Sequence, residues 1–422
     1  MLTETIRQNF LAILAEELIP AMGCTEPIAL AYAAAKGREA LGGLPERIAV
    51  FCSGNMIKNV RCVRIPNSQG LTGIEAACAL GAIAGDAKRH MEVLEAVTEE
   101  GLLKTLKFLN DGLCEVEYLD SLIPLHFIIE LYAGDDCVSV EVRHSHTNIV
   151  RITKNGETLF MTEDLKEATA VADRSELSID NIYSFAEEID FELIEPFTTR
   201  QIECNMAIAE RGMVGDFGVG IGKVITEVYP DNTLTRIRAL ASAASEARME
   251  GCDMPVIIVS GSGNQGITST VPVIVFAREN GIDDEKMRRA LIFSSLMTVY
   301  QKQFIGKLSA FCGVVSAACS AGAAITYMIG GSLTQIKDTV DNTLADIPGI
   351  ICDGAKASCA VKISSALDAS MFAHTLAMQG KAYAANSGIL RGDAEETISC
   401  VGHIGRVGMQ PTDREIVKIM IK

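Results

Sequence analysis

The chain of 422 residues contains no tryptophan, and only 5% of its residues are aromatic. Basic residues are also scarce, because 37 Lys and Arg stand against 54 Asp and Glu and leave a net charge of −17. Nucleic acids and anionic membranes are bound by basic surfaces, so we expect neither as a partner. A hydrophobic content of 48% is ample for a large core. These features predict a globular enzyme with a small-molecule substrate.

Long apolar runs are absent as well. The charge-free stretch 308–336 is rich in Ala, Gly and Ser and is too weakly apolar to predict a membrane span. Residues 1–4 carry no basic segment of the kind that opens a signal peptide. The 13 cysteines include no pair with the two-residue gap of a zinc ribbon or a bacterial ferredoxin. An odd number of cysteines in a chain of this length indicates a reducing compartment, and we predict a cytoplasmic protein with free thiols.

Hydrophobic periodicity predicts an α+β fold in three parts. Apolar residues recur at helical spacing over residues 4–18 and 27–41, and we expect these N-terminal helices, residues 1–42, to pack on the catalytic domain. Residues 43–195 contain strand patterns and are predicted to form an α+β domain. Residues 196–422 are almost wholly helical in pattern and are predicted to form the catalytic domain. Apolar helices in an acidic chain of this size also suggest a homodimer.

Residues 138–152 alternate between apolar and polar positions with a period of two. This pattern predicts one strand, followed by a hairpin turn at Asn155-Gly156. His144 and His146 would then lie on the apolar face of that strand. A histidine there is either a hydrogen-bonded core residue or a group that binds substrate or transfers protons. His146 is accordingly one candidate for acid-base catalysis.

Three loops, residues 53–59, 67–70 and 260–266, combine glycine with amide and hydroxyl side chains. Such loops are common in sites for anions and amino acids, and equally common in plain turns. One of the loops also carries Lys58, a second candidate for the acid-base role. The residues predicted to bind substrate are Ser53, Asn55, Asn67, Ser260, Ser262 and Asn264.

Three cysteines, Cys312, Cys352 and Cys359, lie in or beside segments predicted to be helical, residues 308–329 and 355–377. Cys352 and Cys359 are seven residues apart, a spacing that places them on nearly the same face of a helix. Thiols in apolar surroundings are either core residues or ligands to a soft metal, and both interpretations stay open at this point.

Cys24 precedes the predicted helix 27–41, and we expect Thr25 to cap the first amides of that helix. The positive end of the helix dipole favours a thiolate at such a position. The alternative is a buried thiol that only happens to precede a helix.

Four stretches follow one another along the chain: Met22-Gly23-Cys24-Thr25-Glu26-Pro27, Ser53-Gly54-Asn55-Met56-Ile57-Lys58-Asn59, Ser260-Gly261-Ser262-Gly263-Asn264-Gln265-Gly266 and Cys352-Asp353-Gly354-Ala355-Lys356. Together they resemble the signature motifs of the L-cysteine desulfidase family, which is related to the α part of iron-sulfur L-serine dehydratase. The resemblance spans nearly the whole chain.

This resemblance implies an oxygen-sensitive [4Fe-4S] cluster in which one iron has no protein ligand. Cys312, Cys352 and Cys359 match the three cluster cysteines of the dehydratase relatives. Desulfidase relatives instead implicate the cysteines that match Cys24, Cys312 and Cys352. Cys24 is therefore either a further metal ligand or an acid-base group beside the cluster.

The resemblance also implies β-elimination of L-cysteine to pyruvate, ammonia and hydrogen sulfide, with the open iron as Lewis acid. Cys24, Lys58 and His146 are the candidates for proton transfer. Three alternatives remain. The protein could be a serine dehydratase-like deaminase on the same cluster, a pyridoxal-phosphate β-eliminase that uses Lys58 and the loop 260–266, or an amino-acid sensor without catalysis.

Overall fold

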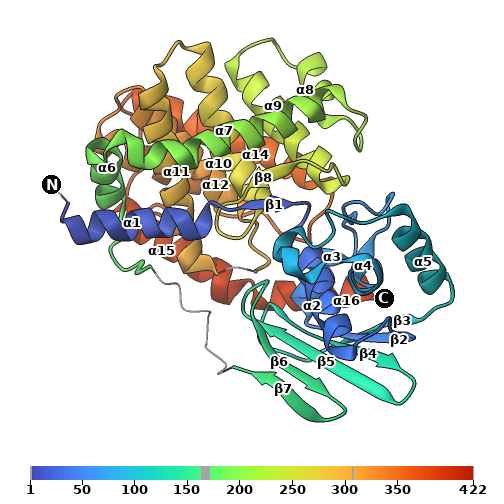
Figure 1. The fold of residues 1–422 in the computed structure, drawn as a ribbon. Coiled ribbons are helices and arrows are strands. Elements are labelled where there is room, and N and C mark those ends of the chain that lie inside the picture. The colour runs from blue at the N-terminus through green and yellow to red at the C-terminus, as the bar shows by residue number, and fades with distance from the viewer. Residues whose placement is uncertain (1, 163–171, 307, 422) are drawn as a thin grey trace.

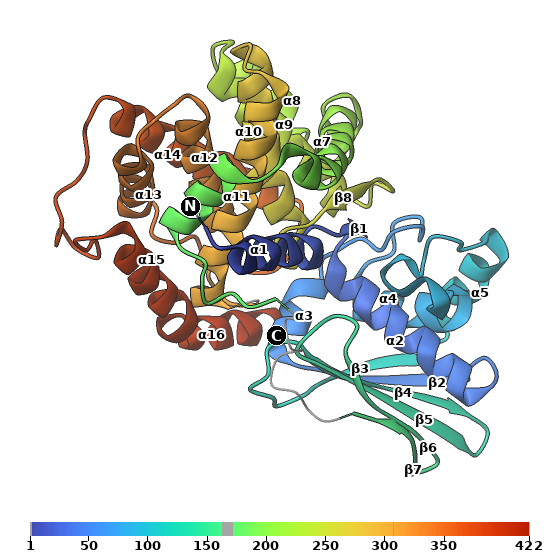
Figure 2. The same ribbon diagram turned by 60° about the vertical axis from the view of Figure 1, so that its left-hand side comes forward.

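A computed structural model describes residues 2–162, 172–306 and 308–421. Two parts lie side by side in Figures 1 and 2, a sheet covered by helices and a larger group of helices. The predicted α+β class is confirmed. No helix in these ranges is long and apolar enough to cross a membrane.

The main sheet contains strands in the order β3-β2-β4-β5-β6-β7, parallel between β2 and β3 and antiparallel elsewhere. Val138, Val140 and Val142 of β5 share one face and are fully buried there, as the alternating pattern predicted. The hairpin turn at Asn155-Gly156 is confirmed, because both residues have positive φ angles, 52° and 85°. The strands are β2 (Arg47–Cys52), β3 (Cys114–Tyr118), β4 (His126–Ala133), β5 (Asp136–Arg143), β6 (Ile149–Lys154) and β7 (Glu157–Met161).

The predicted single strand over residues 138–152 is wrong in its middle. β5 ends at Arg143, because the next residue, His144, adopts a left-handed backbone with φ of 68°. The Asn148 side chain then donates a 2.9 Å hydrogen bond to the carbonyl of Arg143 and closes a turn. His146 therefore lies in the loop between β5 and β6 rather than on the buried face of the sheet.

Helices α2 (Thr25–Leu41) and α4 (Gly73–Ala84) pack on the sheet and on each other (Figure 2). Both are rich in alanine, so their backbones approach closely. A Cβ atom at Gly81 would collide with the backbone of Ala31, which is why this contact requires glycine. The shorter helices nearby are α3 (Gly54–Val60), α5 (Glu99–Asn110) and the 3₁₀ helix η1 (Ala87–Glu92).

The helical part is built around α12 (Val314–Met328), every residue of which is buried. Small side chains along α12 let four other helices pack against it: α10 (Gly263–Glu279), α11 (Asp284–Ile305), α13 (Leu333–Asp346) and α14 (Cys359–Met378). The predicted helix 308–329 is wrong in its first turn and a half, because Phe311 forms an isolated antiparallel bridge with Ile351 instead. The predicted helix 355–377 likewise begins only at Cys359.

The remaining helices surround this centre, and two short antiparallel strands, β1 (Pro20–Met22) and β8 (Pro255–Ile257), join α1 to the segment before α10. The helices are α1 (Glu4–Glu17), α6 (Ile179–Glu188), α7 (Phe191–Val214), α8 (Ile221–Val228), α9 (Thr233–Met249), α10 (Gly263–Glu279), α11 (Asp284–Ile305), α13 (Leu333–Asp346), α14 (Cys359–Met378), α15 (Ala394–His403) and α16 (Gln410–Ile421), with a π-helical turn η2 (Ile404–Gly408) before the last.

The described residues form two large hydrophobic cores, and these divide the chain at places other than the predicted boundaries. One core contains α1, α6 and the C-terminal helices, whereas the other contains α2, α4 and the sheet. The predicted unit 1–42 is thus split between the cores, and α6 belongs to the helical core although it falls within the predicted domain 43–195. Periodicity shows which face of a helix is buried, but it does not show against which partner.

The last helix returns to the sheet-containing part and packs against α3 (Figure 1). Lys58 of α3 is 1% exposed and forms an ion pair with Asp413 of α16. The Lys58 Nζ also donates a 3.3 Å hydrogen bond to the carbonyl of Ser309. These contacts place the C-terminal helix beside the segment that carries Cys312.

Asp341 of α13 provides a test of stability that is independent of the site. Burial raises the pKa of Asp341 to about 6, so the folded protein holds this proton more tightly than the unfolded chain does. Stability is therefore lost as the pH rises from about 4 to about 6 and the carboxyl ionises. We expect Asp341→Asn to raise the free energy of unfolding at pH 7 by about 1–2 kcal/mol, a value reduced for partial solvent exposure.

Urea denaturation at pH 7 and at pH 4 measures this effect. The gain should largely disappear at pH 4, where the aspartate is protonated in the folded state and roughly half protonated in the unfolded chain. Asp346→Asn, at the exposed end of the same helix, is the matched control and should change little at either pH. An equal gain at both pH values would show that ionisation is not the cause.

Candidate active site

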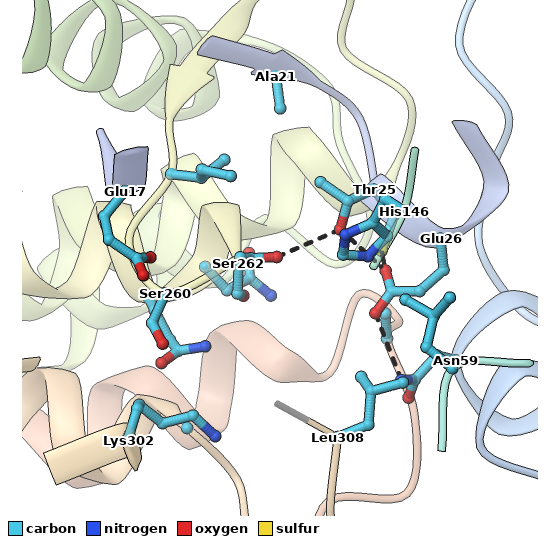
Figure 3. Close-up of a pocket in the computed structure, with 18 of the residues that line it drawn as sticks. Glu17, Ala21, Thr25, Glu26, Asn59, His146, Ser260, Ser262, Lys302 and Leu308 are labelled. Carbon is cyan, nitrogen blue, oxygen red and sulfur yellow. Dashed lines mark hydrogen bonds between the residues drawn. The ribbon is translucent and has the colours of Figure 1, made fainter. Parts of the chain in front are cut away.

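A cavity of about 460 Å³ lies between the two parts of the molecule. Its wall comes from the junction of β1 and α2, the loop after β5, the start of α10, the end of α11 and the segments before α12 and α14. Figure 3 shows Glu26 and Asn59 on one side of the cavity, with Ser260 and Lys302 across from them. This volume is typical of pockets for small ligands.

Three predicted cysteines, Cys312, Cys352 and Cys359, line one wall of this cavity. The bridge between the segments before α12 and α14 brings the first two together. The Cys312 amide donates to the carbonyl of Ile350 at 2.9 Å, and the Cys352 amide donates to the carbonyl of Ala310 at 2.6 Å. Residues 40 positions apart in sequence thus become neighbours across a short antiparallel pairing.

The expectation that Cys352 and Cys359 share a helix face is wrong. Cys352 lies in the bridged segment, and the turn that follows it leads to Cys359 at the start of α14. Gly354 in this turn has a φ of 98°, and a Cβ atom there would collide with the carbonyl oxygen of Lys58. The cysteines converge because this glycine turn packs against α3, not because of helical spacing.

The thiols of Cys312 and Cys352 act on each other. A hydrogen bond with Cys312 lowers the pKa of Cys352 to about 6, and the cation of Lys58 and the amide of Gly354 contribute further. The same hydrogen bond, together with burial, raises the pKa of Cys312. Burial also raises the pKa of Cys359. Cys352 is therefore the thiol of this group that ionises most readily.

Cys24 also lines the cavity, but in different surroundings. It is the residue before α2, its side chain makes no capping bond, and Thr25 is already helical, so the predicted Thr25 cap is wrong. Its Sγ donates to Glu26 Oε2 at 3.0 Å. Burial, and then the charge of Glu26, raise the pKa of Cys24 well above its ordinary value. Of the two interpretations left open for Cys24, these surroundings favour the buried, protonated thiol, because burial and the Glu26 charge outweigh the helix dipole.

The glycine-rich loop before α10 borders the cavity as well. Ser260 and Gly261 have positive φ angles of 49° and 75°, which turn the chain sharply into the helix. Ser262 and Asn264 line the cavity with Ser260. Thr25 donates to the carbonyl of Gly261 at 3.3 Å and so ties this loop to α2.

The other predicted residues lie elsewhere, with one exception. His146 lines the cavity, but Ser53, Asn55, Lys58 and Asn67 do not. The Ser53 hydroxyl donates to the carbonyl of Pro124 at 2.6 Å, and the Asn67 amide donates to the carbonyl of Leu94 at 3.0 Å. These hydroxyl and amide groups hold loops in place.

Several charged or polar residues of the wall had not been predicted as site residues. Glu26 and Asn59 stand inside the quoted motifs, next to predicted positions. Nothing in the sequence marks Arg248 in α9 or Lys302 in α11 as a site residue, because a charged residue in a helix is usually exposed to solvent. Both are buried here, and burial lowers the pKa of Lys302 to about 8.

Residues 88–418 match the family model of the serine dehydratase alpha chain. The chain belongs to this family. Relatives along its whole length include a UPF0597 protein of Lachnoclostridium phytofermentans, 46% identical over 98% of this chain and 99% of the relative, and one of Treponema denticola, 43% identical over 100% and 99%. A UPF0597 protein of Parabacteroides distasonis is 38% identical over 98% of each chain.

The serine dehydratase alpha chain family is associated with iron-sulfur enzymes, so the thiols of this site can be judged as ligands. The side chains suit an iron-sulfur cluster in their chemistry, because three thiols line one wall of the cavity. Lys302 and Lys362 lie close enough to these thiols to offset the negative charge that their thiolates would carry. Within the described ranges no group of three or more His, Cys, Asp or Glu side chains has the geometry of a metal site. Two of the thiols are instead hydrogen-bonded to each other.

Proposed function

We propose that this member of the serine dehydratase alpha chain family is an L-cysteine desulfidase. It would use a [4Fe-4S] cluster held by Cys312, Cys352 and Cys359 to convert L-cysteine and water to pyruvate, ammonia and hydrogen sulfide. The observation that carries the proposal is the convergence of these three thiols on a cavity whose wall also contains the buried cations Arg248 and Lys302 and the buried carboxylate Glu26.

The cluster would supply an open iron that acts as a Lewis acid on the substrate's carboxylate or β-substituent. The protein's own residues must then bind the amino acid, orient its Cα–H and Cβ–S bonds, and move one proton. Lys302 and His146 are the nitrogen bases on the cavity wall, while the protonated Cys24 thiol can donate. Cys24 faces Glu26 rather than the other thiols, which favours the acid-base role over the ligand role.

A pyridoxal-phosphate mechanism receives less support. It would need Lys58 within reach of the loop 260–266, whereas Lys58 is ion-paired with Asp413 and lies outside the cavity that this loop borders. A serine dehydratase activity on the same cluster remains the second candidate, because the family model is named for that reaction.

Anaerobic purification followed by product assays tests the proposal. We expect brown, iron-containing protein that releases sulfide and ammonia from L-cysteine faster than it releases ammonia from L-serine or L-threonine. Faster turnover of L-serine would favour the dehydratase. Protein that binds amino acids but turns over none of them would favour a sensor, and a cofactor band abolished by borohydride would favour pyridoxal phosphate.

A further inference from the structure

Arg248 is a buried cation that forms no ion pair with any residue that the structure describes. Arg248 is 3% exposed and lines the cavity. Within the part of the chain that the structure describes, its guanidinium makes one hydrogen bond, from Nη1 to Asn264 Oδ1 at 3.2 Å. The Nε atom is buried and has no hydrogen-bond partner among the described residues. Burying an arginine in this state is costly, which indicates that a bound anion completes its contacts.

The surroundings of Arg248 hold its side chain in one place. Ser245, one turn earlier in α9, also donates to Asn264 Oδ1, at 3.1 Å. A Cβ atom at Gly263 would collide with the Arg248 guanidinium, so glycine is required for this close approach. By contrast, Arg174, the other arginine on the cavity wall, is paired with Glu16 and Glu17.

Glu26 is the complementary buried carboxylate. It is 8% exposed and accepts hydrogen bonds from the side chains of Cys24, Thr25 and Asn59, at 3.0, 3.2 and 3.4 Å. No cation among the described residues forms an ion pair with it. Glu26 and Arg248 both act on the pKa of Cys24, the first raising it and the second lowering it, so the two charges lie near the same thiol.

We propose that Arg248 binds the α-carboxylate of the substrate and Glu26 binds its α-ammonium group. The ligand class is then the zwitterionic α-amino acid, whose two charges meet opposite charges already fixed in the wall. A planar guanidinium suits a carboxylate, because it can donate two parallel hydrogen bonds. The β-substituent is left free to face the wall that carries Cys312 and Cys352. The assignment rests on the proposed function only in taking an amino acid as the ligand.

Binding of three small ligands to the anaerobically purified protein tests this assignment. L-alanine carries both charges but no β leaving group, so its binding is measured without turnover. Propionate lacks the ammonium group, and ethylamine lacks the carboxylate. Isothermal titration should show that L-alanine binds more tightly than either single-charge ligand. Failure of the unaltered protein to bind any of the three would overturn the proposal.

Two substitutions should separate the charges. Arg248→Lys is expected to weaken L-alanine and propionate roughly 10- to 100-fold and to leave ethylamine unchanged. Glu26→Gln should weaken L-alanine and ethylamine by a similar factor and leave propionate unchanged. Equal losses for all three ligands in Arg248→Lys, or no loss for any, would overturn the assignment.

Controls keep the test independent of folding and of the reaction. Arg238→Lys alters another α9 arginine, which is paired with Asp368 and lies outside the cavity, and should change none of the affinities. Arg248→Gln, which retains a donor toward Asn264, replaces Arg248→Lys if the latter does not fold. The expected binding pattern without sulfide release would refute the desulfidase but not this site. Sulfide release with unchanged binding in Arg248→Lys would refute this site alone.

Discussion

Replacing Cys352 by serine is expected to abolish iron binding and sulfide release. Of the three proposed cluster cysteines, Cys352 ionises most readily, since its pKa of about 6 leaves a thiolate at neutral pH. A serine hydroxyl cannot supply this thiolate. Mutation of a residue that only supports a metal ligand typically lowers metal affinity or activity roughly 10- to 100-fold. Loss of Cys352, which is itself a proposed ligand, should lower them by more than this.

Iron content, the visible spectrum and sulfide release from L-cysteine measure the effect of Cys352→Ser. Cys62→Ser is the control, because Cys62 is an exposed free thiol away from the cavity and should be dispensable. A Cys352→Ser protein that retains both iron and activity would remove Cys352 from the proposed ligand set. Retained iron without activity would instead place Cys352 in contact with the substrate.

Asp413→Asn is expected to lower the free energy of unfolding by about 3–5 kcal/mol. Lys58 is 1% exposed, and its other hydrogen bond is to a neutral carbonyl, so the substitution leaves a buried charge without its counter-ion. The loss should be largely reversed in Lys58→Met/Asp413→Asn, which removes the charge as well. Urea denaturation of the single and double variants measures this coupling.

The neighbouring pair Glu415 and Lys418 provides the control for Asp413. Both residues are exposed on the same helix, so Glu415→Gln should cost less than about 1 kcal/mol. A small loss in Asp413→Asn, similar to that of Glu415→Gln, would mean that Lys58 finds another partner or loses its proton. Lys58 would then again be a candidate for proton transfer.

Local pattern was sufficient for much of the secondary structure. The period-two alternation of residues 138–142 and the Asn155-Gly156 turn predicted β5 and the following hairpin, and the N-terminal periodicity predicted α1 and α2. The errors arose where backbone geometry overrides side-chain pattern. The left-handed His144 ended a strand that its flanking residues would have continued.

The sequence by itself determined the α+β class and the relation to the serine dehydratase alpha chain family, and the resemblance to that family selected the three thiols that line the cavity, because each of these depends on residue type and order. Only the tertiary structure decided how the thiols meet, through the bridge between Phe311 and Ile351 and the turn at Gly354. It also placed Lys58 in an ion pair, and among the residues that the structure describes it gave Arg248 and Glu26 hydrogen-bond partners but no ion-pair partner at the cavity wall. The physical reason is that the effect of a charge depends on its burial and on which charges surround it, and contacts between distant segments set both.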